Sequence, residues 1–163
     1  MVKTIIGVMG AGIATPQDLK LAYQLGKSIA ENNWVLLTGG RTGVMDAASR
    51  GATDNSGLVI GVLPSNSTLG MSEAVDLPIV TDLGNARNNI NVLSSNVVIA
   101  CGMGLGTASE VALALKNHQP TILLNQSELT CKFFASLTAE QLFFARTVEK
   151  AIAQVREILL KKS

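Results

Sequence analysis

Charged and aromatic side chains are scarce in this chain. Charged residues make up 15% of its 163 positions and aromatic residues 4%, and the formal net charge is +1. DNA, RNA and anionic membrane surfaces are bound through a strongly basic field, which this composition does not supply. The chain also has no apolar run close to the roughly 18 residues that cross a bilayer. We therefore expect no nucleic-acid partner and no membrane association.

Cysteine and histidine are also rare. Cys101 and Cys131 stand alone, without a Cys-x-x-Cys pair, and His118 is the single histidine. This spacing suggests neither a disulfide framework nor a zinc site, so we expect no metal-binding residues. Cys101 is better explained as a small buried apolar side chain. Two isolated thiols fit a protein of the reducing cytoplasm.

Apolar residues, in contrast, make up 47% of the chain. Two explanations fit this share together with so little charge. One is a sheet that is buried on both faces, and the other is a large apolar interface between subunits. We expect both, and predict a homo-oligomer, either a dimer or a tetramer.

Strand-like apolar runs alternate with helix-like segments along the whole chain. The segment 126–141 is ambiguous, and a first helix begins after Thr15. The other predicted helices cover residues 44–55, 86–94, 107–117 and 147–161, and the predicted strands cover 3–9, 34–38, 58–63, 77–81, 96–101, 121–124 and 142–145. This order predicts right-handed βαβ units. We therefore expect residues 1–163 to form a single α/β domain, a three-layer Rossmann-like fold with a mainly parallel sheet and helices on both faces.

Glycine-rich turns are the most informative feature. Four of them follow predicted strands and precede predicted helices, at residues 10–12, 39–43, 84–87 and 102–107. Backbone N–H groups at the start of a helix attract phosphate and other anions. The carboxyl ends of parallel strands share one edge of the sheet. The sequence therefore predicts a composite anion site at that edge.

The first turn resembles a dinucleotide-binding fingerprint only in part. Gly10 and Gly12 fit the pattern, but Thr15 stands where the third glycine belongs. A NAD site also requires an acidic residue at the end of the second strand, which here ends in Thr38. NAD binding is therefore not expected, and the turn could also be a tight connection with no ligand.

The second turn, residues 38–43, lacks the Gly-Lys-Ser/Thr ending of a P-loop. Adjacent Gly39 and Gly40 would let a ligand approach the backbone closely. Arg41 is either a fork for an anionic oxygen or an ordinary surface arginine. Thr42, which precedes Gly43, could contact a ligand, cap the following helix, or do both.

The richest segment runs from Gly102 to Glu110. Thr107 and Glu110 have the spacing of a capping box, so Glu110 could simply hold the start of its helix. It could also be a carboxylate in the anion pocket that acts as a general acid or base. A carboxylate beside a bound phosphate needs an intervening cation, and Arg87 is the candidate unless it forms a surface salt bridge.

With these motifs, the chain resembles the Rossmann-like superfamily of LOG phosphoribohydrolases, often mislabelled lysine decarboxylases. The LOG motif Gly-Gly-Gly-x-x-Gly-Leu-Met-Gly is matched at Gly39, Gly40, Gly43 and Met45, whereas Thr38 and Asp46 depart from it. The LOG motif Pro-Gly-Gly-x-Gly-Thr-x-x-Glu is matched at Gly104, Gly106, Thr107 and Glu110, whereas Gly102 and Met103 replace its first two residues. Within the superfamily, the chain is most similar to the short branch that contains the molybdenum cofactor carrier proteins of algae and cyanobacteria.

The resemblance implies a function and two alternatives. The branch implies a protein that binds, protects and carries the molybdenum cofactor, molybdopterin, with transient contacts to cofactor-synthesis proteins or molybdoenzymes. The superfamily implies a nucleoside 5'-monophosphate phosphoribohydrolase with Glu110 and Arg87 as catalytic residues, and a non-catalytic nucleotide-binding protein is the third alternative. The loop at 65–73 could cover the pocket. The predicted ligand-binding residues are Gly10, Gly12, Thr38, Gly39, Gly40, Arg41, Thr42, Gly43, Arg87, Gly102, Met103, Gly104, Leu105, Gly106, Thr107 and Glu110.

Overall fold

The fold is built on a fully parallel sheet. The computed structural model describes residues 2–138 and 140–162. Within these residues the sheet has seven strands in the order β4-β3-β2-β1-β5-β6-β7, and every neighbouring pair runs parallel. The strands are β1 (Ile5–Met9), β2 (Val35–Thr38), β3 (Val59–Leu63), β4 (Leu77–Val80), β5 (Val97–Cys101), β6 (Thr121–Leu124) and β7 (Leu142–Ala145).

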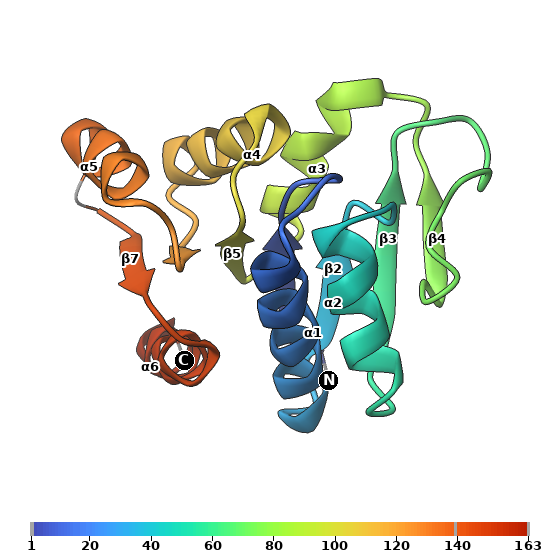
Figure 1. The fold of residues 1–163 in the computed structure, drawn as a ribbon, viewed down its shortest axis with the longest axis horizontal. Coiled ribbons are helices and arrows are strands. Elements are labelled where there is room, and N and C mark those ends of the chain that lie inside the picture. The colour runs from blue at the N-terminus through green and yellow to red at the C-terminus, as the bar shows by residue number, and fades with distance from the viewer. Residues whose placement is uncertain (1, 139, 163) are drawn as a thin grey trace.

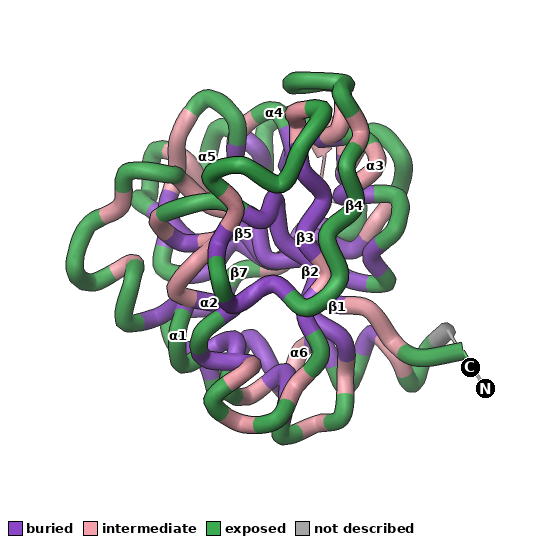
Figure 2. The backbone as a smooth tube through the Cα atoms, turned by 90° about the vertical axis from the view of Figure 1, so that its right-hand side faces the viewer, coloured by how far each residue is buried: buried purple, intermediate pink, exposed green. Residues whose placement is uncertain are grey.

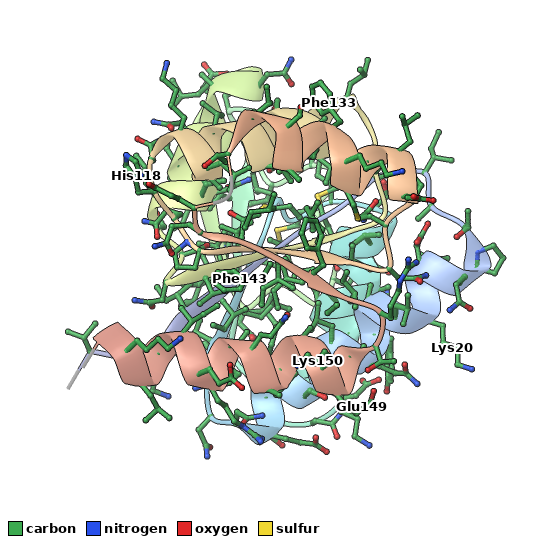
Figure 3. All side chains as sticks on the ribbon, turned by 90° about the vertical axis from the view of Figure 1, so that its left-hand side faces the viewer. Lys20, His118, Phe133, Phe143, Glu149 and Lys150 are labelled. Carbon is green, nitrogen blue, oxygen red and sulfur yellow. The ribbon has the colours of Figure 1, made fainter. Side chains whose placement is uncertain are left out.

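Helices cover both faces of this sheet. Helices α1, α2 and α6 lie on one side, and α3, α4 and α5 lie on the other (Figures 1 and 3). The helices are α1 (Pro16–Glu31), α2 (Val44–Thr53), α3 (Arg87–Leu93), α4 (Leu105–Lys116), α5 (Glu128–Leu137) and α6 (Val148–Lys162), and a 3-10 turn, η1 (Gly84–Ala86), precedes α3. The predicted three-layer Rossmann-like fold is therefore confirmed.

The sheet is buried because both layers cover it. All five residues of β5 are fully buried, and this strand is a continuous run of Val97, Val98, Ile99, Ala100 and Cys101. Such an unbroken apolar run, rather than an alternating one, is typical of a strand between two helical layers. Figure 2 shows the buried residues concentrated along the strands. β4 is the exception, because it lies at the edge of the sheet and all four of its residues are exposed.

Local signals in the sequence place several helix boundaries. The Thr15 hydroxyl accepts a hydrogen bond from the Asp18 amide at 3.1 Å, and Pro16 occupies the first helical position, so α1 begins there. α4 begins two residues earlier than predicted, at Leu105. The ambiguous segment 126–141 contains α5, which Ser127 caps by accepting from the Thr130 amide at 3.1 Å.

The carboxyl ends and the amino ends of the strands carry different kinds of turn. The strand order of the sheet reverses between β1 and β5, and the glycine-rich turns follow the carboxyl ends of β1, β2 and β5. The turns from helix to strand lie at the amino ends of the strands. Four of them contain a non-glycine residue with a positive φ of 56–59°: Asn33, Ser56, His118 and Gln141. Ligands of open α/β sheets bind beside the carboxyl ends, where the strand order reverses.

Candidate functional site

A cavity of about 250 Å³ lies at this reversal point. Its walls come from the turn after β1, the end of β2, the starts of α2 and α3, and the first two turns of α4. The lining residues are Met9, Gly10, Ala11, Gly12, Gly39, Met45, Asn85, Arg87, Asn88, Gly104, Leu105, Gly106, Thr107 and Glu110. We call this cavity the central cavity.

The central cavity brings together many of the residues that the sequence singles out. Each of the four glycine-rich turns contributes at least one residue to it. The predicted ligand-binding residues that line it are Gly10, Gly12, Gly39, Arg87, Gly104, Leu105, Gly106, Thr107 and Glu110.

The other predicted residues lie outside its lining. Thr38 is buried in β2 and its hydroxyl accepts from the Gly40 amide at 3.0 Å, so it shapes the turn from within. Gly102 follows β5 with φ +72°, a conformation that side chains rarely adopt. Met103 contributes instead to an apolar hollow beside Phe133 of α5.

Arg41, Thr42 and Gly43 line a second hollow of about 280 Å³. We call it the outer hollow. The two hollows are connected by one hydrogen bond: the hydroxyl of Thr42, which lines the outer hollow, donates at 3.2 Å to the carbonyl oxygen of Gly12, which lines the central cavity. At Gly43, φ is +67° and an added Cβ would lie 2.3 Å from the Ala11 carbonyl oxygen, so only glycine fits. Gly43 is also the N-cap residue of α2, so the prediction that Thr42 caps this helix is wrong.

The loop at 65–73 lies over the outer hollow. Its residues Gly70 to Glu73 line that hollow together with Arg41. The Ser72 amide donates to the Gly40 carbonyl oxygen at 2.9 Å, and the Ser72 hydroxyl donates to Asp46 at 2.6 Å. Asp46 in turn accepts from Arg50 at 2.8 Å. These bonds tie the loop to the second glycine-rich turn and to α2.

The start of α4 is open toward the central cavity. Gly104 is its N-cap residue, and no side chain caps this end. The backbone N–H groups of the first turn have no partner within a helix, and together they carry a partial positive charge. Because Leu105, Gly106 and Thr107 all line the cavity, their amides form a donor group suited to an anionic oxygen.

Thr107 and Glu110 do not form the predicted capping box. The helix begins two residues before Thr107, so Thr107 is its third residue rather than its N-cap. Thr107 is only 2% exposed, and its hydroxyl has no hydrogen-bond partner among the described residues. A buried polar group without a protein partner is costly, so the Thr107 hydroxyl is available to a polar group in the cavity.

Glu110 is a buried carboxyl group in the wall of the central cavity. It is 7% exposed, and its Oε1 accepts from Asn91 Nδ2 of α3 at 2.9 Å. Burial raises the pKa of Glu110, while the hydrogen bond from Asn91 and the positive charge of Arg87 lower it. A raised pKa in a cavity is a feature of functional carboxyl groups.

Arg87 organises the site from the opposite wall. Its Nη1 donates to the carbonyl oxygens of Gly39 and Val62, which links the start of α3 to the ends of β2 and β3. Burial lowers the pKa of Arg87, and the charge of Glu110 raises it. Its Nε is buried and unpaired among the residues that the structure describes. Arg87 is thus anchored to the backbone and does not point freely at a ligand.

Asn91 supports the site through Glu110, and sequence reasoning missed it. It is fully buried, and it positions Glu110. Its spacing of four from Arg87 places both on one face of α3. Asn88, on the neighbouring part of that face, donates to Ser109 of α4 at 2.9 Å. A cluster of asparagines in a helix that also carries Arg87 is the signal that could have identified this face.

Two glycines at the start of α4, the N-cap residue Gly104 and the helical residue Gly106, have room for a side chain in the described structure. An added Cβ at Gly106 would meet nothing within 4 Å among the described residues, and one at Gly104 would make only an ordinary contact with Ala11 at 3.6 Å. Neither has a positive φ. Glycine is unfavourable inside a helix, so Gly106, the second residue of α4, is a position that would allow a ligand to approach the backbone closely.

These features define a class of protein: a Rossmann-like α/β fold with a glycine-lined cavity at the point where the strand order reverses. Among the described residues, no three His, Cys, Asp or Glu side chains group as a metal site would require. The chain belongs to the SLOG cluster4 family, whose sequence model matches residues 3–152. The resemblance to the Rossmann-like LOG superfamily is therefore confirmed.

Solved structures of similar sequence cover almost the whole chain. The molybdenum cofactor binding protein of Rippkaea orientalis is 60% identical, with a TM-score of 0.95 over 98% of this chain and 99% of that one. The molybdenum cofactor carrier protein of Chlamydomonas reinhardtii is 52% identical, with a TM-score of 0.92 over the same shares. An uncharacterized protein of Archaeoglobus fulgidus is 46% identical over 111 residues, which are 68% of this chain and 73% of that protein.

Proposed function

We propose that this protein binds, protects and carries the molybdenum cofactor. The observation that carries the proposal is the similarity, at 52–60% identity over 98% of the chain, to a binding protein and a carrier protein for that cofactor. The two hollows supply chemistry that suits it. The cofactor carries a phosphate and molybdenum-bound oxygens, which are acceptors, and the walls present many backbone N–H donors.

Different parts of the site would hold different parts of the cargo. The amides of Gly104, Gly106 and Thr107 would donate to anionic oxygens in the central cavity, with Gly39 beside them. Arg41, which is exposed at the outer hollow, would supply positive charge there, together with the Thr42 hydroxyl. Arg87 contributes mainly by fixing Gly39 in place. Enclosure in these hollows would shield an oxidisable cofactor from solvent.

Cofactor loading followed by metal analysis tests the proposal. Purified protein is loaded with molybdenum cofactor, passed through a gel-filtration column, and analysed for molybdenum per chain. We expect close to one molybdenum per chain. The control variant Glu149→Gln should retain the same amount, because Glu149 is exposed on α6, which lies across the sheet from α4 and α5 (Figure 3). Protein that emerges without molybdenum would contradict the proposal.

A phosphoribohydrolase activity is the second candidate, since Glu110 and Arg87 line the same cavity. In that reaction Glu110 would act on the N-glycosidic bond of a nucleoside monophosphate. The engagement of Arg87 with two backbone carbonyl groups leaves it poorly placed to bind a phosphate. Incubation with AMP and related nucleotides tests this candidate. Base release that disappears in Glu110→Gln would support it, and no release from any nucleotide would reject it.

A non-catalytic nucleotide-binding role would use the same donors. Competition tests it: nucleotides that bind in the central cavity would displace the cofactor when present in sufficient excess, and nucleotides that do not bind there would leave the cofactor in place. We also propose transient contacts with cofactor-synthesis proteins or molybdoenzymes, since a carrier must receive and deliver its cargo.

The free cysteines Cys101 and Cys131 fit our proposal of a cytoplasmic location.

We further propose a homo-oligomer that forms through α5. Leu129, Phe133 and Leu137 follow one another at intervals of four, so they share one face of this helix, and they are 80%, 56% and 64% exposed. Exposed apolar stripes of this kind are typical of subunit interfaces.

Within residues 2–138 and 140–162, every helix is too short or too polar to cross a membrane.

A further inference from the structure

The central cavity combines N–H groups that attract anions with an acidic side chain that repels them. Its glycine turns and the start of α4 are suited to anions, yet the Glu110 carboxyl lies in the same wall. A carboxylate and a phosphate or molybdate oxygen are both acceptors and repel each other. The part of a ligand that lies against Glu110 must therefore present hydrogen-bond donors.

The hydrogen bonds of Glu110 leave room for such donors. Asn91 is the only hydrogen-bonding partner of the carboxyl group among the residues that the structure describes, and it bonds to Oε1 alone. A carboxylate has about four acceptor positions. The Thr107 hydroxyl, three residues earlier on the same face of α4, is also unpaired in the described part of the chain. The Thr107 hydroxyl thus lacks a partner among the described residues and Glu110 keeps free acceptor positions, and both residues line the cavity.

The chemistry of the proposed cargo supplies one matching part. Its phosphate and its molybdenum-bound oxygens offer only acceptors. Its pterin ring has an aminopyrimidinone edge, on which an amino group and a ring N–H lie side by side next to a carbonyl oxygen. Two parallel N–H donors match a carboxylate in the way that an arginine fork does, and the neighbouring carbonyl oxygen suits a hydroxyl donor.

We propose that Glu110 binds the aminopyrimidinone edge of the pterin, with the Thr107 hydroxyl beside it, so that the ring enters the central cavity first. This inference rests on the carrier function. It also makes Glu110 a residue that determines specificity, rather than a catalytic acid or base. Asn91 is then a positioning residue, which fills one acceptor position of Oε1 and leaves the other position of Oε1, together with Oε2, for the two ring donors.

The sizes of the hollows agree with this orientation. The central cavity, at about 250 Å³, is smaller than the roughly 300–1,000 Å³ of sites that enclose a complete ligand. The remainder of the cofactor therefore extends outward past the start of α4. The outer hollow, at about 280 Å³ and connected to the central cavity by the hydrogen bond between Thr42 and Gly12, places Arg41 where the anionic end emerges.

Binding of two small fluorescent ligands tests the orientation without the metal. Pterin carries the amino group, and lumazine has a carbonyl oxygen in its place. Titration of the wild-type chain is expected to show roughly tenfold to a hundredfold tighter binding of pterin, the difference that a charge-assisted hydrogen bond makes. In Glu110→Gln this preference should shrink at least several-fold, while Glu149→Gln should keep it.

Each outcome decides the inference. Equal binding of the two ligands by the wild type, a preference for lumazine, or binding of neither overturns it, and so does a preference that survives intact in Glu110→Gln. The wild-type comparison needs no variant, so a folding defect cannot obscure it. The molybdenum-retention experiment stays separate: a chain that prefers pterin but retains no molybdenum would overturn the carrier function alone.

Discussion

At the scale of single residues, Glu110 combines burial with an acidic group. Desolvation favours its protonated form, so its pKa is raised in the folded state relative to the unfolded chain. The protein is then most stable at low pH, as far as this group is concerned. That stability is lost as the pH rises through the folded-state pKa. The charged and polar groups that face it, Arg87 and Asn91, both come from α3 and moderate the effect without removing it.

We expect Glu110→Gln to be more stable than the wild type above neutral pH, by about 1 kcal/mol, as is usual when a strained functional group is removed. The difference should fade as the pH falls below the range in which Glu110 ionises. Urea unfolding at several pH values between acidic and mildly alkaline conditions measures it, with Glu149→Gln as control. Parallel stability curves for wild type and Glu110→Gln would contradict the prediction.

Gly106 allows stability and binding to be separated. Gly106→Ala should stabilise the chain by about 0.5–1 kcal/mol, because alanine is the better helix former and the added methyl group meets nothing. The same methyl group should weaken cofactor binding at least several-fold. Thermal unfolding and the molybdenum-retention assay measure the two effects.

Gly26 in α1 provides the matched contrast. A Cβ there would lie 1.9 Å from the Ala48 carbonyl oxygen of α2, so Gly26→Ala should destabilise the chain by roughly 1–3 kcal/mol. It lies outside the central cavity, so molybdenum retained per folded chain should not change. If both alanine variants behaved alike in both assays, the idea that Gly106 makes room for a ligand would fail.

At the scale of elements, the Arg87 side chain links the start of α3 to the sheet by hydrogen bonds, in addition to the apolar packing of Val92. Arg87 donates to Gly39 at the end of β2 and to Val62 within β3. It therefore fixes the second glycine-rich turn relative to α3. Since hydrogen bonds to charged groups are worth about 1.5–3 kcal/mol, this anchor is a substantial part of the local stability.

Arg87→Ala should therefore destabilise the chain by about 2–3 kcal/mol, and it should increase amide hydrogen exchange at residues 39–43. Exposed Lys150 of α6 supplies the control, since Lys150→Ala removes a cation on a helix that contributes no described residue to the central cavity or the outer hollow (Figure 3). Unchanged exchange at residues 39–43 in Arg87→Ala would mean that other contacts hold the turn.

The element scale also shows what could be predicted from the sequence. Seven strands were expected close to their observed positions, because unbroken apolar runs between glycine turns are typical of a doubly covered sheet. α5 was ambiguous for a physical reason. Its core side presents Phe134 and its outer side presents Phe133, so the two-sided distribution of apolar residues obscures the helical period.

The site was less predictable than the fold. The capping-box interpretation failed because three glycines precede Thr107, and nothing in their sequence indicates which of them begins the helix. Asn91 acts only through a contact between α3 and α4, which local patterns do not reveal. Arg41 and Arg87 look equivalent in sequence, and only the fold shows that one is exposed and the other anchored.

At the scale of the whole molecule, the apolar residues are found in two places. One is the core, where the sheet is covered by both helical layers, as expected. The other is the exposed stripe of α5. That residues 1–163 form one domain stays a prediction.

Association through α5 gives a direct prediction. The wild type should sediment as a species heavier than 17.1 kDa, and Phe133→Asp should shift it toward that mass, because a charge in an apolar interface is costly. Leu160→Glu is the control, since Leu160 is 78% exposed but lies on α6. Sedimentation of the wild type at 17.1 kDa alone would contradict the oligomer, and a shift caused by Leu160→Glu would place the interface on the other helical layer.

Because all strands run in one direction, the two ends of the sheet differ: the carboxyl ends of the strands meet at one end of the protein and the amino ends at the other. Every glycine-rich turn faces one way, so cargo arrives and departs at a single end. The opposite end holds helix-to-strand turns, among them the tight reversals at Asn33, Ser56, His118 and Gln141. A dye, a tether or a fused partner attached at that end would leave the central cavity open. That end is therefore the suitable place for a label that follows uptake and release of the cofactor.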